Sequence, residues 1–190
     1  MPEANGMDIM DDVDCFWTWL HKSLPSIAQS WHCRPNLSKI ACSGESAGGY
    51  LSVQSALMFP HSNIKVMISI AAPLNFDVPY YSVPRPRTFI GSRPPPPRQA
   101  EANIRAYLKN MKPGAIRTGC EPSEMWELAL CIFQQSYLPR FFGVKKWPVL
   151  DVMATLDKVK TMPPLWVVHG QDDTMVCTQS LYKANVARAK

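Results

Sequence analysis

The sequence predicts an α/β fold, with a mostly parallel sheet of about three strands, flanking helices and an inserted helical region. Short apolar segments at residues 39–43, 64–70 and 164–170 are bounded by loops or glycine, as buried strands are. Residues 47–58, between the first two segments, contain no proline and have apolar side chains at helical spacing. A strand, a helix and a strand in this order form a βαβ unit, whose two strands run parallel.

Helices are expected on both sides of this unit. Residues 9–20 carry apolar side chains at spacings of three and four, which predicts an amphipathic helix that ends before Pro25. Residues 100–111 and 122–137 have the same helical period. Residues 179–190 predict a final helix.

Proline divides the chain. Of the 190 residues 18 are proline, and six of these lie within residues 84–97. This segment is expected to be extended or irregular, because proline lacks the amide donor that a helix needs. It lies in an insertion, residues 74–150, that separates residues 1–73 from residues 151–190. Residues 93–98 also resemble a basic polyproline ligand for aromatic grooves, and a loop within the insertion is the alternative interpretation.

The composition is that of one ordinary domain, with 46% apolar residues, 18% charged residues and a net charge of +5. Basic residues form no run of five, which disfavours a nucleic acid partner. No stretch approaches the roughly 18 apolar residues of a membrane span, and the opening residues do not resemble a signal peptide. The six cysteines form no Cys-x-x-Cys pair, so they predict reduced thiols in a cytoplasmic protein and no metal site.

A Gly-x-Ser-x-Gly motif joins the first strand to its helix, in the sequence Gly44-Glu45-Ser46-Ala47-Gly48-Gly49. In this context the motif predicts a nucleophile elbow, in which a strained bend presents the Ser46 hydroxyl and glycines allow the strand and helix to approach. The backbone N–H of Ala47, at the positive end of the helix, is then a candidate oxyanion donor. A purely structural turn is the alternative.

A second polar segment, residues 169–176, directly follows the third strand. The carboxyl ends of parallel strands meet at one edge of a sheet, so this segment is expected near Ser46. Asp173 is the candidate catalytic acid, and helix capping or a solvated position in the loop is the alternative for it. Phe76, Tyr80 and Tyr81 follow the second strand and are expected at the mouth of the pocket.

These two segments resemble the α/β-hydrolase fold, in particular its hormone-sensitive-lipase-like branch, the alpha/beta hydrolase fold-3 family. Gly44 to Gly49 matches the elbow of that family, and Pro163 to Val176 matches its acid loop. The resemblance implies a serine hydrolase of small carboxylic esters that uses no metal or organic cofactor. It implies Ser46 as nucleophile, Asp173 as acid and Ala47 as oxyanion donor, with residues 74–150 forming an inserted cap over the acyl pocket.

The chain departs from that family pattern in two places. No His-Gly-Gly segment precedes Ser46, and no histidine follows Asp173. His21, His32 and His61 are expected at the surface, and only His169 is expected near the site. We therefore expect weak or no hydrolysis from this chain, which resembles an internal fragment of a hydrolase. The alternative is a degenerate, non-catalytic hydrolase that binds a ligand or a partner.

Overall fold

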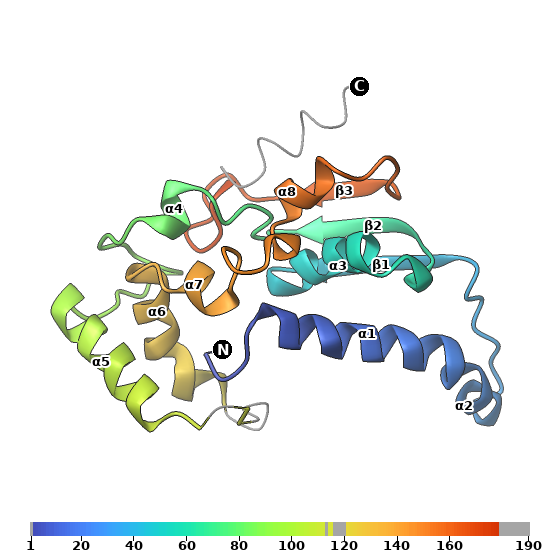
Figure 1. Cartoon of the computed structure of the whole chain (residues 1–190), viewed down its shortest axis with the longest axis horizontal. Coiled ribbons are helices and arrows are strands. Elements are labelled where there is room, and N and C mark those ends of the chain that lie inside the picture. The colour runs from blue at the N-terminus through green and yellow to red at the C-terminus, as the bar shows by residue number, and fades with distance from the viewer. Residues whose placement is uncertain (1, 113, 116–120, 179–190) are drawn as a thin grey trace.

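Three parallel strands form the sheet, in the order β1–β2–β3 (Figure 1). They are β1 (Ile40–Glu45), β2 (Ile64–Ile70) and β3 (Leu165–Val168). The structure is a computed structural model, and it describes residues 2–112, 114–115 and 121–178. The expected α/β fold with three parallel strands and flanking helices is confirmed. β1 extends two residues further toward Ser46 than the sequence predicted, and β3 is shorter at both ends.

The first two strands and the helix between them form the expected βαβ unit. Helix α3 (Ala47–Met58) packs against both β1 and β2. Val53 is fully buried in this interface, and so is Met67 of β2. The prediction succeeds because every contact in this unit is made within about 30 residues of sequence.

The two faces of the sheet differ in how far other residues cover them. Cys42 and Met67 are register partners on the face that α3 covers. On the opposite face, Ala41 pairs with Val66 and Ile68 pairs with Trp166. Val66 is 40% exposed and Trp166 is 66% exposed, so no described residues cover this face fully.

Two helices precede the sheet. Helix α1 (Gly6–Lys22) begins at Asn5, whose side chain accepts hydrogen bonds from the amides of Met7 and Asp8 in a capping box. It ends before Pro25, as predicted. Helix α2 (Leu24–Ser30) follows directly, with Pro25 in its first turn, where a backbone N–H would have no partner within the helix and its loss costs nothing. The 3-10 turn η1 (Pro60–Ser62) follows α3 and contacts α1.

The segment between β2 and β3 forms short helices that gather beyond the carboxyl ends of the strands (Figure 1). They are α4 (Pro79–Ser82), α5 (Pro97–Asn110), η2 (Pro122–Met125), α6 (Trp126–Gln134), α7 (Leu138–Phe142), η3 (Pro148–Leu150) and α8 (Val152–Leu156). Helix α5 begins three residues before its predicted start, because Pro97 occupies the first turn of the helix.

The helix predicted for residues 122–137 is wrong as a single element. A 3-10 turn precedes α6, and α6 ends at Gln134 because Ser136 has a positive φ of 57°. The Gln134 side chain donates to the Pro95 carbonyl over 2.9 Å, and the backbone carbonyl of Gln134 accepts from the Arg85 amide over 3.2 Å. The proline-rich segment is therefore packed onto α6, with Phe89 fully buried.

Aromatic side chains join the inserted helices to the sheet. Tyr50 of α3 contacts Phe142 of α7 and Phe76 of the loop after β2, with ring centroids 5.3 and 5.8 Å apart. The Tyr50 hydroxyl donates to the Leu150 carbonyl over 2.6 Å. The final helix predicted for residues 179–190 lies outside the described residues. Within the part of the chain that the structure describes, no helix is both long and apolar enough to cross a membrane.

Candidate active site

Ser46 occupies the sharp bend between β1 and α3. Its backbone has φ 52° and ψ −121°, a conformation that is strained for any residue other than glycine. The Ser46 amide donates to the Ile70 carbonyl over 2.9 Å, which ties the bend to the end of β2. Its carbonyl accepts from the Tyr50 amide over 3.2 Å, so the bend continues directly into the helix. Ser46 is exposed at this position.

Two glycines of the motif are required by the close approach of strand and helix. A Cβ on Gly44 would lie 2.2 Å from the backbone of Gly48, and a Cβ on Gly49 would lie 2.8 Å from the Cβ atom of Ala72. A Cβ on Gly48 would meet nothing within 4 Å. The expectation that Gly48 needs to be glycine is therefore wrong in this structure, because Gly48 contributes its backbone to the contact. Glu45 is exposed at the end of β1.

Ala47 is the first residue of α3, a helix of 12 residues. The first amides of a helix have no partner within the helix, and they lie at the positive end of its dipole. The N–H of Ala47 is therefore available beside Ser46 for an oxygen that gains negative charge.

Asp173 holds the loop that follows β3. Its Oδ1 accepts from the amides of Met175 and Val176 over 2.8 and 2.9 Å. Its Oδ2 lies 3.3 Å from Nε2 of His169, and the Asp173 side chain is 20% exposed. The carboxylate thus caps a turn within the loop, where helix capping or solvation was the expected alternative, and it also keeps one oxygen beside an imidazole.

His169 is buried and already bonded. Its side chain is 3% exposed, and its Nε2 lies 2.8 Å from the Val176 carbonyl oxygen. Because a carbonyl only accepts, we assign the hydrogen to Nε2. Nδ1 is then a buried acceptor without a partner among the described residues. In this arrangement His169 stabilises the loop around Asp173 through its contact with the Val176 carbonyl, and it has no accessible nitrogen that could act on Ser46.

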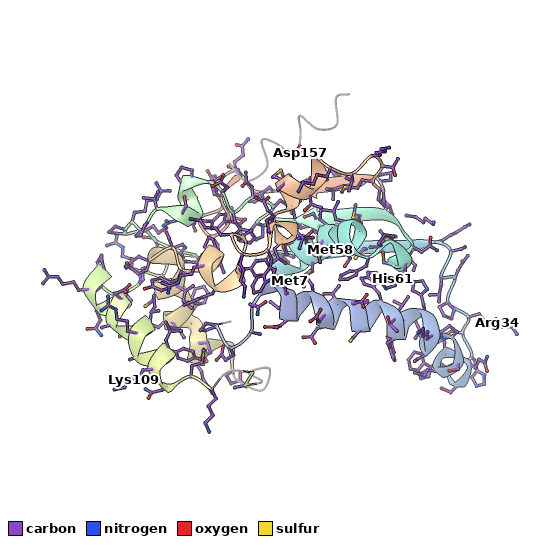
Figure 2. All side chains as sticks on the ribbon, viewed as in Figure 1. Met7, Arg34, Met58, His61, Lys109 and Asp157 are labelled. Carbon is purple, nitrogen blue, oxygen red and sulfur yellow. The ribbon has the colours of Figure 1, made fainter. Side chains whose placement is uncertain are left out.

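The other three histidines lie elsewhere. His61 pairs with Asp14 over 3.2 Å, and Nε2 of His21 lies 3.2 Å from the Ser62 carbonyl. Both contacts are at η1, beyond the far end of α3, and a helix of this length separates them from Ser46 by about 18 Å. Figure 2 shows His61 on the side away from the inserted helices. His32 is exposed after α2, as expected.

The segment between β2 and β3 fixes the loop around Asp173. The Tyr80 hydroxyl donates to the carbonyls of Thr174 and Met175 over 2.6 and 3.2 Å. Burial raises the pKa of Tyr80 above its ordinary value of 10.0, so the phenol remains a donor at neutral pH. The Ile90 amide donates to Oγ1 of Thr174 over 3.1 Å. Sequence reasoning missed these contacts, because nothing local pairs residues 80 and 90 with residue 174.

The aromatic residues expected at a pocket mouth are mostly packed. Tyr80 and Tyr81 are 9% and 2% exposed and belong to the core, which corrects that expectation for both. Phe76 is 6% exposed, and its ring contacts Tyr81 and lines a cavity. Among the described residues, no group of three or more histidine, cysteine or acidic side chains is placed to hold a metal ion.

Two curated proteins are similar to this chain. Over 178 residues it is 51% identical to a probable carboxylesterase, M8, of a Phoma species, and 51% identical to another, clz11, of Cochliobolus lunatus. Each match covers 93% of this chain, and it covers 55% of M8 and 81% of clz11. The chain belongs to this family of probable carboxylesterases. It spans little more than half the length of M8.

The family match includes both candidate site segments. Because it covers 178 of the 190 residues, Ser46 and Asp173 both fall within the matched part. No protein-family model and no solved structure matches the chain. The family and the fold are thus established, and the role of each side chain is argued from the site itself.

Proposed function

We propose that this chain carries the nucleophile and the acid of a serine hydrolase of small carboxylic esters, of the α/β-hydrolase type and its hormone-sensitive-lipase-like branch. The observation that carries the proposal is Ser46, which is exposed at a strained strand-to-helix bend beside free helix amides. Non-glycine residues with such backbone angles are uncommon and cluster at functional sites. The names of the two relatives support the reaction class.

The proposed chemistry is acyl transfer through a covalent intermediate. Ser46 Oγ attacks the ester carbonyl carbon while a base removes the hydroxyl proton. The carbonyl oxygen becomes an oxyanion, which the Ala47 N–H stabilises. The ester bond to the alcohol breaks, the alcohol leaves with the proton, and water then releases the acid from Ser46. In this scheme Asp173 stabilises the positive charge of the protonated base.

The missing participant is the base. His169 is buried and bonded, and the other described histidines lie by the far end of α3 or after α2. In serine hydrolases, loss of the triad histidine costs up to about 10⁶ in rate, and loss of one oxyanion donor costs about 10²–10³. We therefore expect this chain alone to hydrolyse esters no faster than its Ser46→Ala variant.

Chemical rescue tests both that Ser46 is the nucleophile and that this chain lacks the base. Imidazole can act as a mobile base at an exposed serine, so hydrolysis of p-nitrophenyl acetate is followed with increasing imidazole, for the chain and for Ser46→Ala. We expect a saturating, Ser46-dependent acceleration beyond the reaction of imidazole with the ester. Equal rates for both proteins at every imidazole concentration would remove Ser46 as the nucleophile. Fast hydrolysis by the chain without imidazole, lost in Ser46→Ala, would show that the chain has its own base.

The absent base also favours a second candidate function, a degenerate hydrolase that binds a ligand without converting it. The discriminating result is a compound that raises the melting temperature of the chain, is recovered unchanged, and still binds Ser46→Ala. Imidazole rescue would count against this second function.

A further inference from the structure

A separate cavity of about 640 Å³ lies between α4, α7 and the η3–α8 segment. This volume is typical of a small-molecule site. Its lining residues fall within residues 76–82, 136–146 and 148–151, and they include Phe76, Arg140, Val144, Lys145 and Lys146. Neither Ser46 nor Asp173 is among them, so the cavity is distinct from the candidate active site.

The cavity is lined by both apolar and cationic side chains. Phe76 is 6% exposed, and Val144 is half-buried beside prolines. Arg140, Lys145 and Lys146 also line the cavity, and all three are exposed. A ligand that satisfies both kinds of side chain has an apolar body and an anionic end.

The turn that contains Lys145 and Lys146 is held by hydrogen bonds and by a glycine. The amides of Lys146 and Trp147 both donate to the Gly143 carbonyl, over 3.0 and 2.9 Å. Gly143 has a φ of 89°, and a Cβ there would lie 2.5 Å from the Trp147 ring, so only glycine fits. The Lys146 ammonium lies 4.2 Å from the centre of the Trp147 ring. This contact orders the Lys146 side chain, and Lys146 is one of the residues that line the cavity.

The charges of the lining favour a single negative charge on the ligand. No ion pair between described residues involves Arg140, Lys145 or Lys146. Two carboxylates, Asp77 and Asp151, also line the cavity, so its formal charge is +1. Asp151 is engaged elsewhere, because its Oδ1 accepts from the amides at the start of α8 over 2.9 and 3.2 Å.

We propose that this cavity binds an amphipathic carboxylate, with the apolar body against Phe76 and Val144 and the carboxylate against Lys145 and Lys146. The binding does not depend on the chemistry of Ser46. Lysine ammonium groups form charge-assisted hydrogen bonds to carboxylates, and these are about twice as strong as neutral ones. The neutral analogue of the same length should therefore bind less tightly.

Calorimetric titration tests this with octanoate and with octanol, its uncharged counterpart. We expect octanoate to bind the chain at least about tenfold more tightly than octanol, and added salt to reduce only the octanoate affinity. Replacing both lysines, Lys145→Gln with Lys146→Gln, should raise the Kd for octanoate about tenfold and leave that for octanol unchanged. The matched control, Lys109→Gln with Lys158→Gln, removes two exposed lysines outside the cavity and should bind as the wild type does (Figure 2 labels Lys109).

Three outcomes would overturn the proposal. Equal affinities for octanoate and octanol would show that no anionic end is recognised. An unchanged octanoate Kd in the Lys145→Gln, Lys146→Gln variant, with the melting temperature of the wild type, would place the charge recognition elsewhere. Loss of octanoate binding in Ser46→Ala would show that the ligand occupies the candidate active site. A negative imidazole rescue has no bearing on these measurements, so the two proposals fail independently.

Discussion

The two halves of the candidate site are built in different ways. The bend at Ser46 is made within the βαβ unit, because Gly44 contacts the backbone of Gly48 and the Ser46 amide donates to Ile70 of the adjacent strand. The loop around Asp173 depends on a distant partner, since the Tyr80 hydroxyl holds its backbone from 94 residues away. The first half is thus encoded locally and the second by the tertiary fold. Variants should separate the two.

Gly44→Ala is expected to have the largest effect. Its Cβ would lie 2.2 Å from the Gly48 backbone, which cannot move without breaking the start of α3. We expect a loss of about 3 kcal/mol or more in the free energy of unfolding, measured by urea denaturation. The matched control is Gly48→Ala, where a Cβ meets nothing and alanine favours a helix, so stability should be equal or slightly higher. Equal losses in both variants would mean that the described approach of strand and helix is wrong.

Asp173→Ala should come next, because two amides of the acid loop lose their acceptor. At about 1 kcal/mol for each bond, the expected cost is about 2 kcal/mol. Asp173→Asn retains an oxygen acceptor and should keep most of this stability. In imidazole-rescued hydrolysis both variants should be slower than the wild type, because both lack the charge. Full activity of Asp173→Asn would leave Asp173 with the capping role alone.

Tyr80→Phe should loosen the acid loop from a distance. It leaves two carbonyls of that loop without their donor, at a cost of about 1.5 kcal/mol. Hydrogen exchange should accelerate at the amides of Met175 and Val176, while the amides of α3 keep their protection. Uniform acceleration throughout the chain would contradict a local role for Tyr80.

Ile90→Asn should have a smaller effect of the opposite sign. Ile90 is β-branched, has a φ of 48° and is 66% exposed, so its side chain gains little from burial. It precedes Gly91 in a turn closed by two hydrogen bonds between Phe89 and Ser92, where Asn-Gly is the favoured pair. We expect a gain of about 1 kcal/mol, seen as a rise of about 3 °C in the melting temperature. Val83→Asn, at an exposed position with a φ of −115°, should give no such gain.

The smallest expected effect lies outside both halves of the site. The Tyr137 hydroxyl donates to Glu101 over 2.8 Å and lowers the pKa of Glu101 from 4.5. A lowered folded-state pKa gives stability that is present above pH 4.5 and is lost as the pH falls through the folded-state value. For this partly exposed pair we expect about 0.3 kcal/mol, absent from Tyr137→Phe. The difference in unfolding free energy between wild type and variant, measured at pH 7 and pH 3, should shrink at the lower pH.

The same division between local and distant contacts explains what the sequence could predict. The βαβ unit and the motif at Ser46 can be predicted from the sequence, because the apolar periodicity and the glycine spacing that define them extend over only a few residues. Helix α6 ends earlier than predicted, at a backbone turn that the sequence does not indicate. Ser136 has a positive φ there, and serine is not a residue from which a positive φ is predicted. The burial of His169 and the bond from Tyr80 to Thr174 depend on how β3 meets the inserted helices, which residue spacing does not encode.

Covalent trapping tests most directly whether the bend presents a nucleophile. The chain is incubated with a fluorophosphonate in the presence of imidazole, digested, and mapped by mass spectrometry alongside Gly48→Ala and Ser46→Ala. We expect one adduct, on the peptide that contains Ser46, in the wild type and in Gly48→Ala and none in Ser46→Ala. An adduct on another serine, or equal labelling of the Ser46→Ala variant, would contradict the role we assign to Ser46.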